Sequence, residues 1–330
     1  MDEQGRMRIG VCGVGSIGSR HARLLAQRGD VDLYVADNVE AHIREIQKFA
    51  TVAASTASFE QMLEFGLDGV IVATPDHLHV PFAEAACRHG VPVLLEKPIA
   101  ETAAIAERLL AVSDETGTQI LVGYPLRHNA IFLRAKEILD QGQIGLPVSF
   151  QVELGAYETL VVAKNRFKPG DQNKIFVDYS HEWDYIQWFL GKAKRVVGSS
   201  HTLGGREKKQ EPNVVNALLQ LESGVSGTVH LDYIQTPGKR VFGIVGDAGA
   251  MTVDASRRSI FLQRYSDEFE MTYTLAETFD SMMARQLDHF LGVVAGREEC
   301  RVVVEDGINA LRVADALILS AETSSWQLIK

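Results

Sequence analysis

The sequence predicts an α/β protein of two domains: an N-terminal Rossmann domain with a doubly wound parallel sheet, and a C-terminal α+β domain with a large, mostly antiparallel open sheet. Strand-length apolar runs alternate with amphipathic helical stretches up to about residue 124, and a glycine turn joins the first pair. Later segments are β-rich runs joined by turns. A chain of 330 residues is long enough for two such domains.

The N-terminal elements follow the βαβ rhythm. Expected strands cover residues 8–12, 31–37, 69–74, 91–95 and 118–123, and expected helices cover 19–28, 78–89 and 101–116. Glycines close two of these helices, at Gly29 and Gly90. We therefore expect a cofactor-binding domain over residues 1–124.

After Tyr124 the pattern changes to β-rich segments that are joined by turns instead of helices. Expected strands cover 147–154, 213–221, 224–233, 240–245 and 259–265, with a hairpin turn at 222–224, and expected helices cover 130–141, 181–190, 281–295 and 306–322. These helices leave one sheet face without cover, which predicts a homo-oligomer, dimer or tetramer, formed through that open face. Residues 125–330 are thus expected to bind substrate and to oligomerise, with a polar loop near the site over 164–174.

Charge and cysteine content narrow the class of protein. Lysine and arginine total 33 against 43 acidic residues, and the net charge of −10 predicts neither a nucleic-acid nor a membrane partner. Three cysteines lie far apart without C-x-x-C spacing, so no metal or redox pair is expected. No apolar run approaches the roughly 18 residues of a membrane span, and we expect a cytoplasmic protein.

The first turn, Gly13-Val14-Gly15-Ser16-Ile17-Gly18, fits the G-x-G-x-x-G dinucleotide fingerprint. Gly13 permits the tight turn, Gly15 lets a pyrophosphate approach the backbone, and Gly18 lets helix and strand pack closely. Ser16 and Ile17 would add their backbone N–H groups at the positive end of the helix. The alternative is a tight turn that binds no ligand.

An acidic residue stands where the fingerprint needs one. Asp37 ends the second expected strand 19 residues after Gly18, beside Asn38. A carboxylate there accepts hydrogen bonds from ribose hydroxyls and repels a 2′-phosphate, which predicts NAD as the cofactor over NADP. The alternative for Asp37 is a turn or capping aspartate.

Four further segments make the sequence similar to the glucose–fructose oxidoreductase, inositol dehydrogenase and MocA family of NAD(P)-dependent oxidoreductases. The resemblance covers nearly the whole chain. Besides the glycine turn, it rests on Ala73-Thr74-Pro75-Asp76-His77-Leu78-His79, Glu96-Lys97-Pro98, Gly123-Tyr124-Pro125-Leu126-Arg127 and Asp178-Tyr179-Ser180-His181-Glu182-Trp183-Asp184.

The Thr74 segment follows the third expected strand. Thr74 and Pro75 would line the ribose and nicotinamide side, because ligands of open parallel sheets bind at the carboxyl ends of the strands. The resemblance implies that His79 and its loop, with His77, help to position the cofactor. The His-x-His spacing does not predict a metal site, since no carboxylate or cysteine completes one and the two rings diverge at a helix start.

Lys97 directly follows an apolar strand, which brings its ammonium to the ligand edge of the sheet. Oxidation of an alcohol requires a base and a cation near the hydroxyl oxygen, and Lys97 is predicted to supply the cation. Glu96 would lie with it beneath the nicotinamide, and the resemblance implies a cis peptide before Pro98. The alternative is a solvated surface lysine.

His181 is the predicted proton acceptor, and Asp178 would fix its tautomer. Asp178 precedes His181 by three residues, whereas the commonest family pattern has four. The spacing resembles a D-x-S-H-E branch, and it leaves open whether Asp178 contacts the substrate, His181 or neither. The alternative for His181 is a solvent-exposed residue at a helix start.

Residues after the last N-terminal strand complete the predicted site. Tyr124, Arg127 and His128 would hydrogen-bond a polyhydroxylated substrate, as the resemblance implies; Arg127 could instead pair with a surface acid. The aromatic group Trp183, Tyr185, Trp188 and Phe189 lies at helical spacing and is interpreted as core packing.

The resulting hypothesis is a dehydrogenase or reductase that transfers a hydride between NAD and a secondary alcohol or carbonyl of a sugar, inositol or sugar derivative. Two alternatives keep the fold: an NAD-dependent glycosidase or an imine or diol oxidoreductase, and a non-catalytic dinucleotide-sensing regulator. Intact Lys97 and His181 argue against the regulator.

Overall fold

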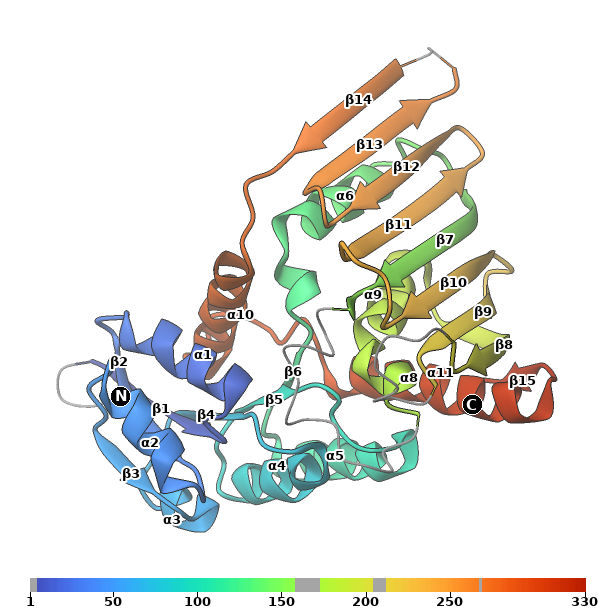
Figure 1. Ribbon diagram of the computed structural model, residues 1–330. Helices are drawn as coiled ribbons and strands as arrows, with labels where there is room; N and C mark the ends of the chain where they lie inside the picture. Colours follow the sequence, from blue (N-terminus) through green and yellow to red (C-terminus); the bar gives the residue numbers. More distant parts are fainter. Residues whose placement is uncertain (1–4, 158–172, 204–211, 267–268) are drawn as a thin grey trace. The chain divides into compact units, whose positions relative to one another are not determined.

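A computed structural model describes residues 5–157, 173–203, 212–266 and 269–330. The chain forms two compact units: unit 1 takes residues 1–128 and 278–308, and unit 2 takes 129–277 and 309–330 (Figure 1). Each unit is described by itself. The predicted loop over 164–174 lies largely outside the described residues. The assignment of binding roles to residues 1–124 and 125–330 stays a prediction.

Unit 1 contains a six-stranded, fully parallel sheet in the order β3-β2-β1-β4-β5-β6. Strands such as β1 and β5 are apolar and buried on both faces, as parallel sheets require. The predicted Rossmann fold is confirmed. The strands are β1 (Met7–Cys12), β2 (Val31–Ala36), β3 (Ala54–Thr56), β4 (Gly69–Val72), β5 (Val93–Glu96) and β6 (Ile120–Gly123).

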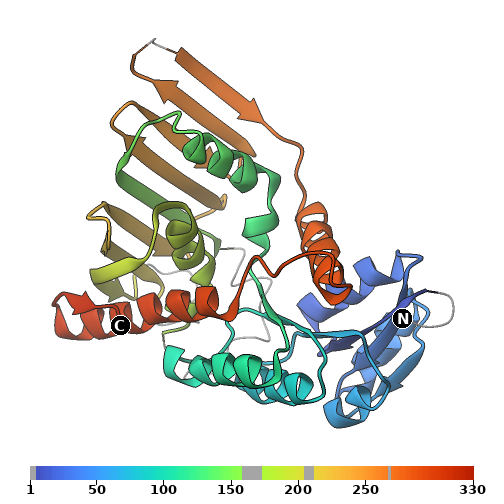
Figure 2. The same ribbon diagram turned by 180° about the vertical axis from the view of Figure 1, so that it is seen from behind.

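The helices of unit 1 cover both sides of this sheet, with α1 and α2 on one side and α4 and α5 on the other (Figures 1 and 2). Side-chain caps fix several starts: Thr102 accepts a hydrogen bond from Ile105 N at the start of α5. The helices are α1 (Ser16–Ala26), α2 (Glu40–Gln47), α3 (Phe59–Leu63), α4 (His79–Arg88) and α5 (Ala103–Thr116), with 3-10 turns η1 (Asp76–Leu78) and η2 (Pro125–His128).

The helix α10 (Phe279–Val294) belongs to unit 1 although it follows most of unit 2 in sequence. Thr278 and Ser281 form a capping box at its start. Leu287, Phe290 and Leu291 join the same hydrophobic cluster as the strand residues of β1. A Cβ at Gly69 would lie 3.0 Å from the Phe290 ring, so a glycine in β4 makes room for this helix.

Unit 2 contains a nine-stranded sheet in the order β14-β13-β12-β11-β7-β10-β9-β8-β15. Within the described part of unit 2, only β7 and β10 pair in parallel, so the predicted mostly antiparallel sheet is confirmed. The strands are β7 (Pro147–Gly155), β8 (Ala193–His201), β9 (Val214–Leu221), β10 (Ser226–Asp232), β11 (Lys239–Gly246), β12 (Gly249–Asp254), β13 (Ser259–Arg264), β14 (Phe269–Thr274) and β15 (Gln327–Leu328).

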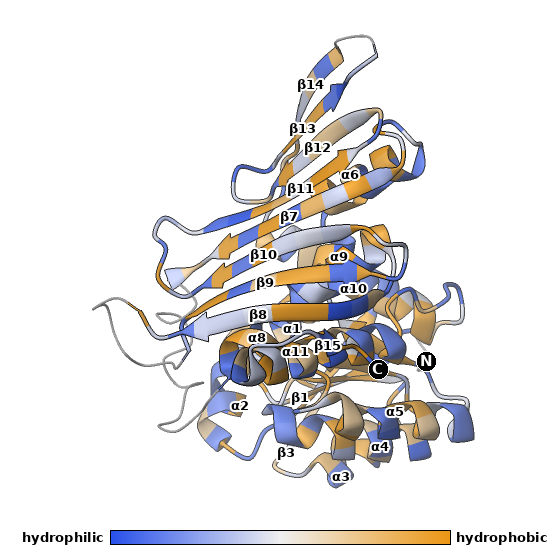
Figure 3. Ribbon diagram, turned by 90° about the vertical axis from the view of Figure 1, so that its right-hand side faces the viewer, coloured by the Kyte–Doolittle hydropathy of each residue, from blue (hydrophilic) through white to orange (hydrophobic). Residues whose placement is uncertain are grey.

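The helices of unit 2 are α6 (Ala130–Asp140), α8 (Lys174–Asp178), α9 (Ser180–Leu190) and α11 (Val304–Thr323), the last of which begins in unit 1. In the view of Figure 3, α6 and α9 lie behind the sheet and α8 and α11 are drawn below β8, while hydrophobic and hydrophilic residues are mixed along the strands in front. Trp183, Tyr185 and Phe189 are buried in α9, which confirms their interpretation as core, whereas Trp188 of the same group is half-buried. None of the helices in the described ranges is long and apolar enough to cross a membrane.

Candidate active site

Three loops of unit 1 leave the same edge of the parallel sheet. The glycine turn follows β1, Thr74 and Pro75 follow β4, and Lys97 follows β5. Because β1, β4 and β5 are adjacent parallel strands, their carboxyl ends meet at one edge. The structure therefore brings the predicted glycine, threonine and lysine segments together.

Each glycine of the turn has its own structural reason. Gly13 has φ +81°, and a Cβ there would lie 2.6 Å from Ala73 O. A Cβ at Gly18 would lie 1.8 Å from Gly13 O, so helix and turn cannot accept a side chain there. A Cβ at Gly15 would meet nothing within 4 Å, so the space beside it is open to a ligand.

The start of α1 offers donors to an anion. Gly15 is the N-cap residue and supplies no capping side chain. Ser16, which is exposed, and Ile17, which is half-buried, open the helix. N–H groups at a helix start together with the helix dipole favour a pyrophosphate, so this turn fits a dinucleotide.

Asp37 links the glycine turn to the loop after β2. Its Oδ2 accepts a hydrogen bond from Val14 N and its Oδ1 accepts one from Val39 N, both at 2.8 Å. A hollow of about 240 Å³ adjoins it, lined also by Asn38, Arg44 and Thr56. The carboxylate thus braces the turn and borders a space where an adenosine ribose would bind.

His79 connects two of the three loops. Its Nε2 lies 2.8 Å from Thr74 O and its Nδ1 lies 2.7 Å from Pro98 O. His79 is buried whereas His77 is exposed. His79 therefore holds the β4 and β5 loops at a fixed separation.

Glu96 ends β5 and is buried beside Lys97, and the Lys97–Pro98 bond is cis as the resemblance implied. Glu96 Oε1 lies 2.7 Å from Nε2 of His21, a fully buried residue of α1. His21 was not among the predicted site residues. Its position three residues after Gly18, on the face of the helix that meets the sheet, could have indicated it.

The second group of candidates lies in unit 2. Asp178 ends α8 and is buried, and Tyr233 donates a hydrogen bond to its Oδ2 at 2.8 Å. His181 is the second residue of α9 and is half-buried. Tyr179 donates to Asp232 O at 3.3 Å, so the end of β10 supports the segment between the two helices.

A buried ion pair follows His181 directly. Glu182, at 0% exposure, lies 2.8 Å from Nε of Arg240 on β11. The Glu182 carboxylate raises the pKa of Arg240 against the opposing effect of burial, so this guanidinium stays charged. The pair joins the start of α9 to the sheet. Neither Arg240 nor Tyr233 was predicted. Each lies more than 50 residues from its partner in the sequence, and the two meet only because the sheet brings that strand next to the helix.

The predicted substrate ligands after β6 lie deep in unit 1. Tyr124 is fully buried, and Arg127 donates to Asp306 Oδ1 at 2.9 Å. His128 is 5% exposed, its ring centroid lies 5.3 Å from that of His289, and its carbonyl accepts a hydrogen bond from Arg285. Roles of these residues in binding substrate stay predictions.

The free energy of unfolding should depend on pH in a way that is set by His128. Burial, reinforced by His289 and nearby arginines, lowers its pKa to about 3. The unfolded chain binds this proton below about pH 6.5, whereas the folded chain does not, so the free energy of unfolding should fall with falling pH between these values, by up to about 1.4 kcal/mol per pH unit. His128→Phe should flatten this slope in thermal unfolding measured from about pH 7 to about pH 4, and the exposed His89→Phe should not. An unchanged slope in His128→Phe would contradict the assignment.

The cysteines should be inert in the folded protein. Burial raises the pKa of Cys12 to about 12, and those of Cys87 and Cys300 to about 11. Thiolate, the reactive form, is therefore scarce at neutral pH. We expect no rapid reaction with a disulfide-exchange reagent until the chain is unfolded, when all three thiols should react. Fast labelling of the native protein would be inconsistent with this burial.

The parallel sheet, the glycine turn and the carboxylate after β2 are together the features of a dinucleotide-binding Rossmann domain. Models of one family match both parts of the chain: the oxidoreductase family with an NAD-binding Rossmann fold over residues 7–124, and the C-terminal domain of the glucose–fructose oxidoreductase, inositol dehydrogenase and MocA family over 132–252. The chain belongs to this family.

Relatives extend over nearly the whole chain. The sequence is 27% identical to the rhizopine catabolism protein MocA of Rhizobium meliloti, covering 94% of each chain, and 26% identical to inositol 2-dehydrogenase 1 of Saccharopolyspora erythraea, covering 96% and 94%. Its fold is that of scyllo-inositol dehydrogenase from Lactobacillus casei, solved with NAD(H) and scyllo-inositol, with a TM-score of 0.83 at 20% identity over 98% and 99% of the two chains.

Proposed function

We propose that this oxidoreductase oxidises a secondary alcohol of an inositol or a closely related polyol or sugar with NAD. The observation that carries the proposal is the placement of Lys97 at the sheet edge that also holds the glycine turn, two strands away. Relatives named as inositol dehydrogenases support the substrate class.

The proposed roles divide the proton and charge chemistry between two side chains. NAD, when bound, takes up the hydride that leaves the carbinol carbon. Lys97 supplies a cation that stabilises negative charge on the oxygen, and His181 accepts the hydroxyl proton as the carbonyl forms. Asp178, held by Tyr233 at 2.8 Å, is proposed to orient His181 or the substrate. Each proton and electron pair is then accounted for.

A substrate panel tests this function. The purified protein is incubated with NAD and with myo-inositol, scyllo-inositol, levoglucosan or a glycoside, while reduced nicotinamide is followed by absorbance. We expect NADH to accumulate with an inositol. Cleavage of the glycoside without net NADH would instead select the glycosidase alternative, and tight NADH binding without any turnover would select the regulator.

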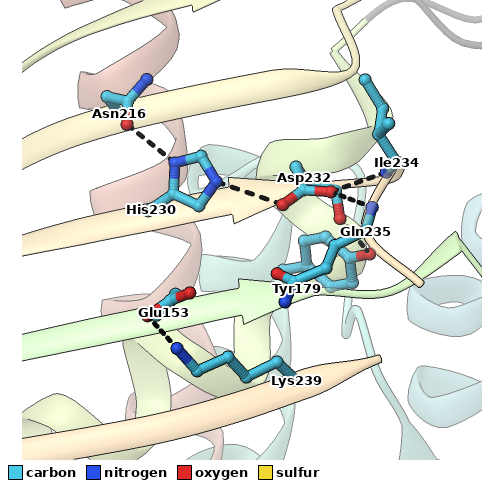
Figure 4. Close-up of polar contacts among 8 residues, drawn as sticks. All are labelled: Glu153, Tyr179, Asn216, His230, Asp232, Ile234, Gln235 and Lys239. Atoms are coloured by element: carbon cyan, nitrogen blue, oxygen red, sulfur yellow. Dashed lines mark hydrogen bonds and ion pairs between the residues drawn. The ribbon is translucent and has the colours of Figure 1, made fainter. Parts of the chain in front are cut away.

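We further propose that the protein works in the cytoplasm as a homo-oligomer built through the open face of the nine-stranded sheet. That face carries Glu153 paired with Lys239, and His230 between Asn216 at 2.8 Å and Asp232 at 3.1 Å (Figure 4). A surface that presents both signs of charge is complementary to a second copy of itself across a two-fold axis. The face also displays apolar Leu218.

The oligomer is tested on β9, a strand of that face. Leu218→Arg should shift the protein to a smaller species in sedimentation velocity, because a charge would be buried without a partner. Leu146→Arg, at a 73% exposed position before β7, is the matched control and should sediment as the wild type does. If both variants keep the wild-type sedimentation coefficient, another surface forms the assembly or there is none.

A further inference from the structure

A buried histidine–carboxylate pair includes Glu96, the residue that precedes the proposed catalytic Lys97 in the chain. His21 and Glu96 approach to 2.7 Å, and their side chains are 0% and 9% exposed. Nδ1 of His21 is buried without a hydrogen-bond partner among the described residues. The hydrogen bond of this imidazole is therefore made through Nε2, to Glu96.

The other carboxylate oxygen faces the lysine turn. Glu96 Oε2 accepts a hydrogen bond from Lys97 N at 3.3 Å. Gly123 on the adjacent strand leaves room for this carboxylate, since a Cβ there would lie 3.2 Å from Glu96 Cδ and Oε2. The pair therefore connects helix α1, which follows the glycine turn, to the backbone of Lys97.

The charge state of Glu96 follows from its neighbours. Burial raises the pKa of this carboxyl, but the hydrogen bond from His21 and the positive fields of His21, Lys97 and His79 together lower the pKa below its usual value. Glu96 is thus a buried anion next to the residue proposed to act as a cation.

A stability role alone accounts poorly for this arrangement. A buried ion pair contributes little to folding compared with apolar side chains of the same volume, because desolvation offsets the attraction. Leu or Met at both positions would join α1 to β5 at least as well. The pair does, however, connect α1, the helix that follows the glycine turn, to the backbone of Lys97.

We propose that His21 is a positioning residue of the oxidoreductase: through Glu96 it fixes the turn that carries Lys97 and keeps a negative charge beside it. The inference rests on the proposed role of Lys97. His21 itself contacts Glu96 and transfers no proton to substrate.

A double-mutant cycle tests the inference. His21→Gln, which keeps a donor but no charge, should lower kcat for myo-inositol or scyllo-inositol oxidation about tenfold, while the KM for NAD stays within about threefold. In a Lys97→Met background, the same change should lower kcat no further, because coupled residues are non-additive. His89→Gln, at an exposed helix end, is the matched control and should leave kcat unchanged.

Two results would overturn the inference. An equal loss in both backgrounds would show that His21 acts elsewhere, and an unchanged kcat in His21→Gln would show that it has no positioning role. If Lys97→Met itself leaves kcat unchanged, the proposed function of Lys97 fails first, which is a distinct outcome.

An NMR titration of Lys97, which does not depend on catalysis, tests the same coupling in variants shown to be folded. Lysines are reductively ¹³C-methylated, and the Lys97 signal is assigned by its absence in Lys97→Met. The pH titration of this signal should differ between wild type and either His21→Gln or His21→Asn, and should be unaffected by His89→Gln. Identical titration curves in folded His21 variants would rule out coupling between the two residues.

Discussion

Lys97→Met should lower kcat for inositol oxidation about 1,000-fold while NAD still binds, because a positioned acid–base or cationic group contributes about 10² to 10⁴ in rate. Methionine keeps much of the side-chain length and removes the charge together with the N–H donors of the ammonium. The effect should fall on kcat and kcat/KM alike, since the ammonium stabilises charge that develops on the oxygen in the transition state. Steady-state kinetics with saturating NAD measure it.

The matched control is Lys48→Met, on an exposed lysine of unit 1 that pairs with Glu45. It should retain the wild-type kcat. Lys97→Arg separates charge from shape: a guanidinium keeps the charge but not the compact ammonium, so we expect only partial recovery. A Lys97→Met enzyme within tenfold of wild type would remove the lysine from the mechanism.

Gly15→Val should abolish tight NAD binding while leaving the fold intact. No atom lies within 4 Å of a Cβ at this position, and the backbone φ of −68° is outside the left-handed region that favours glycine, so we expect the variant to fold. A valine would occupy the space through which a pyrophosphate approaches the turn, and we expect NAD affinity to fall at least about 100-fold. Calorimetric titration and thermal unfolding measure the two quantities.

Gly18→Ala should behave differently, because its Cβ would lie 1.8 Å from Gly13 O. The turn must move, so both stability and NAD affinity should fall, stability by about 3 kcal/mol. Gly29→Val, with open space around its Cβ, is the control that should affect neither. Unimpaired NAD binding by Gly15→Val would mean that the dinucleotide does not use this turn.

The Rossmann domain was predictable because its signals are local. A strand, a glycine turn and an acid at the end of the next strand occur within 30 residues, and each has a backbone reason that the structure confirms at Gly13 and Gly18. The hairpin turn at 222–224 was also correct, with Gly224 at φ +92° between two antiparallel strands. Elements that depend on residues close together in the sequence could therefore be predicted.

Short or weakly patterned elements were missed. The strands β3, β8, β12, β14 and β15 and the helices α2, α3 and α8 had not been assigned. β3 has three residues and β14 is largely exposed, so neither shows a clear apolar pattern. The strand over 193–201 contains Gly198 and serines and is stabilised by sheet pairing with β9 and by α11.

The return of α10 to unit 1 required contacts that the sequence does not display. The helix itself was expected over 281–295, but its partner surface depends on space at Gly69, more than 200 residues earlier. His21 was missed for the same kind of reason, since its acidic partner Glu96 lies 75 residues away. Pairings of this kind are fixed by packing.

Deuterium transfer tests the central claim most directly. Inositol that carries deuterium on its ring carbons is incubated with NAD and the wild-type protein, and NADH and the sugar product are analysed by mass spectrometry. The account predicts one deuterium in the NADH for each ketone formed, with the yield of both collapsing in Lys97→Met. Unlabelled NADH, or no ketone from any inositol while NAD binds, would contradict it.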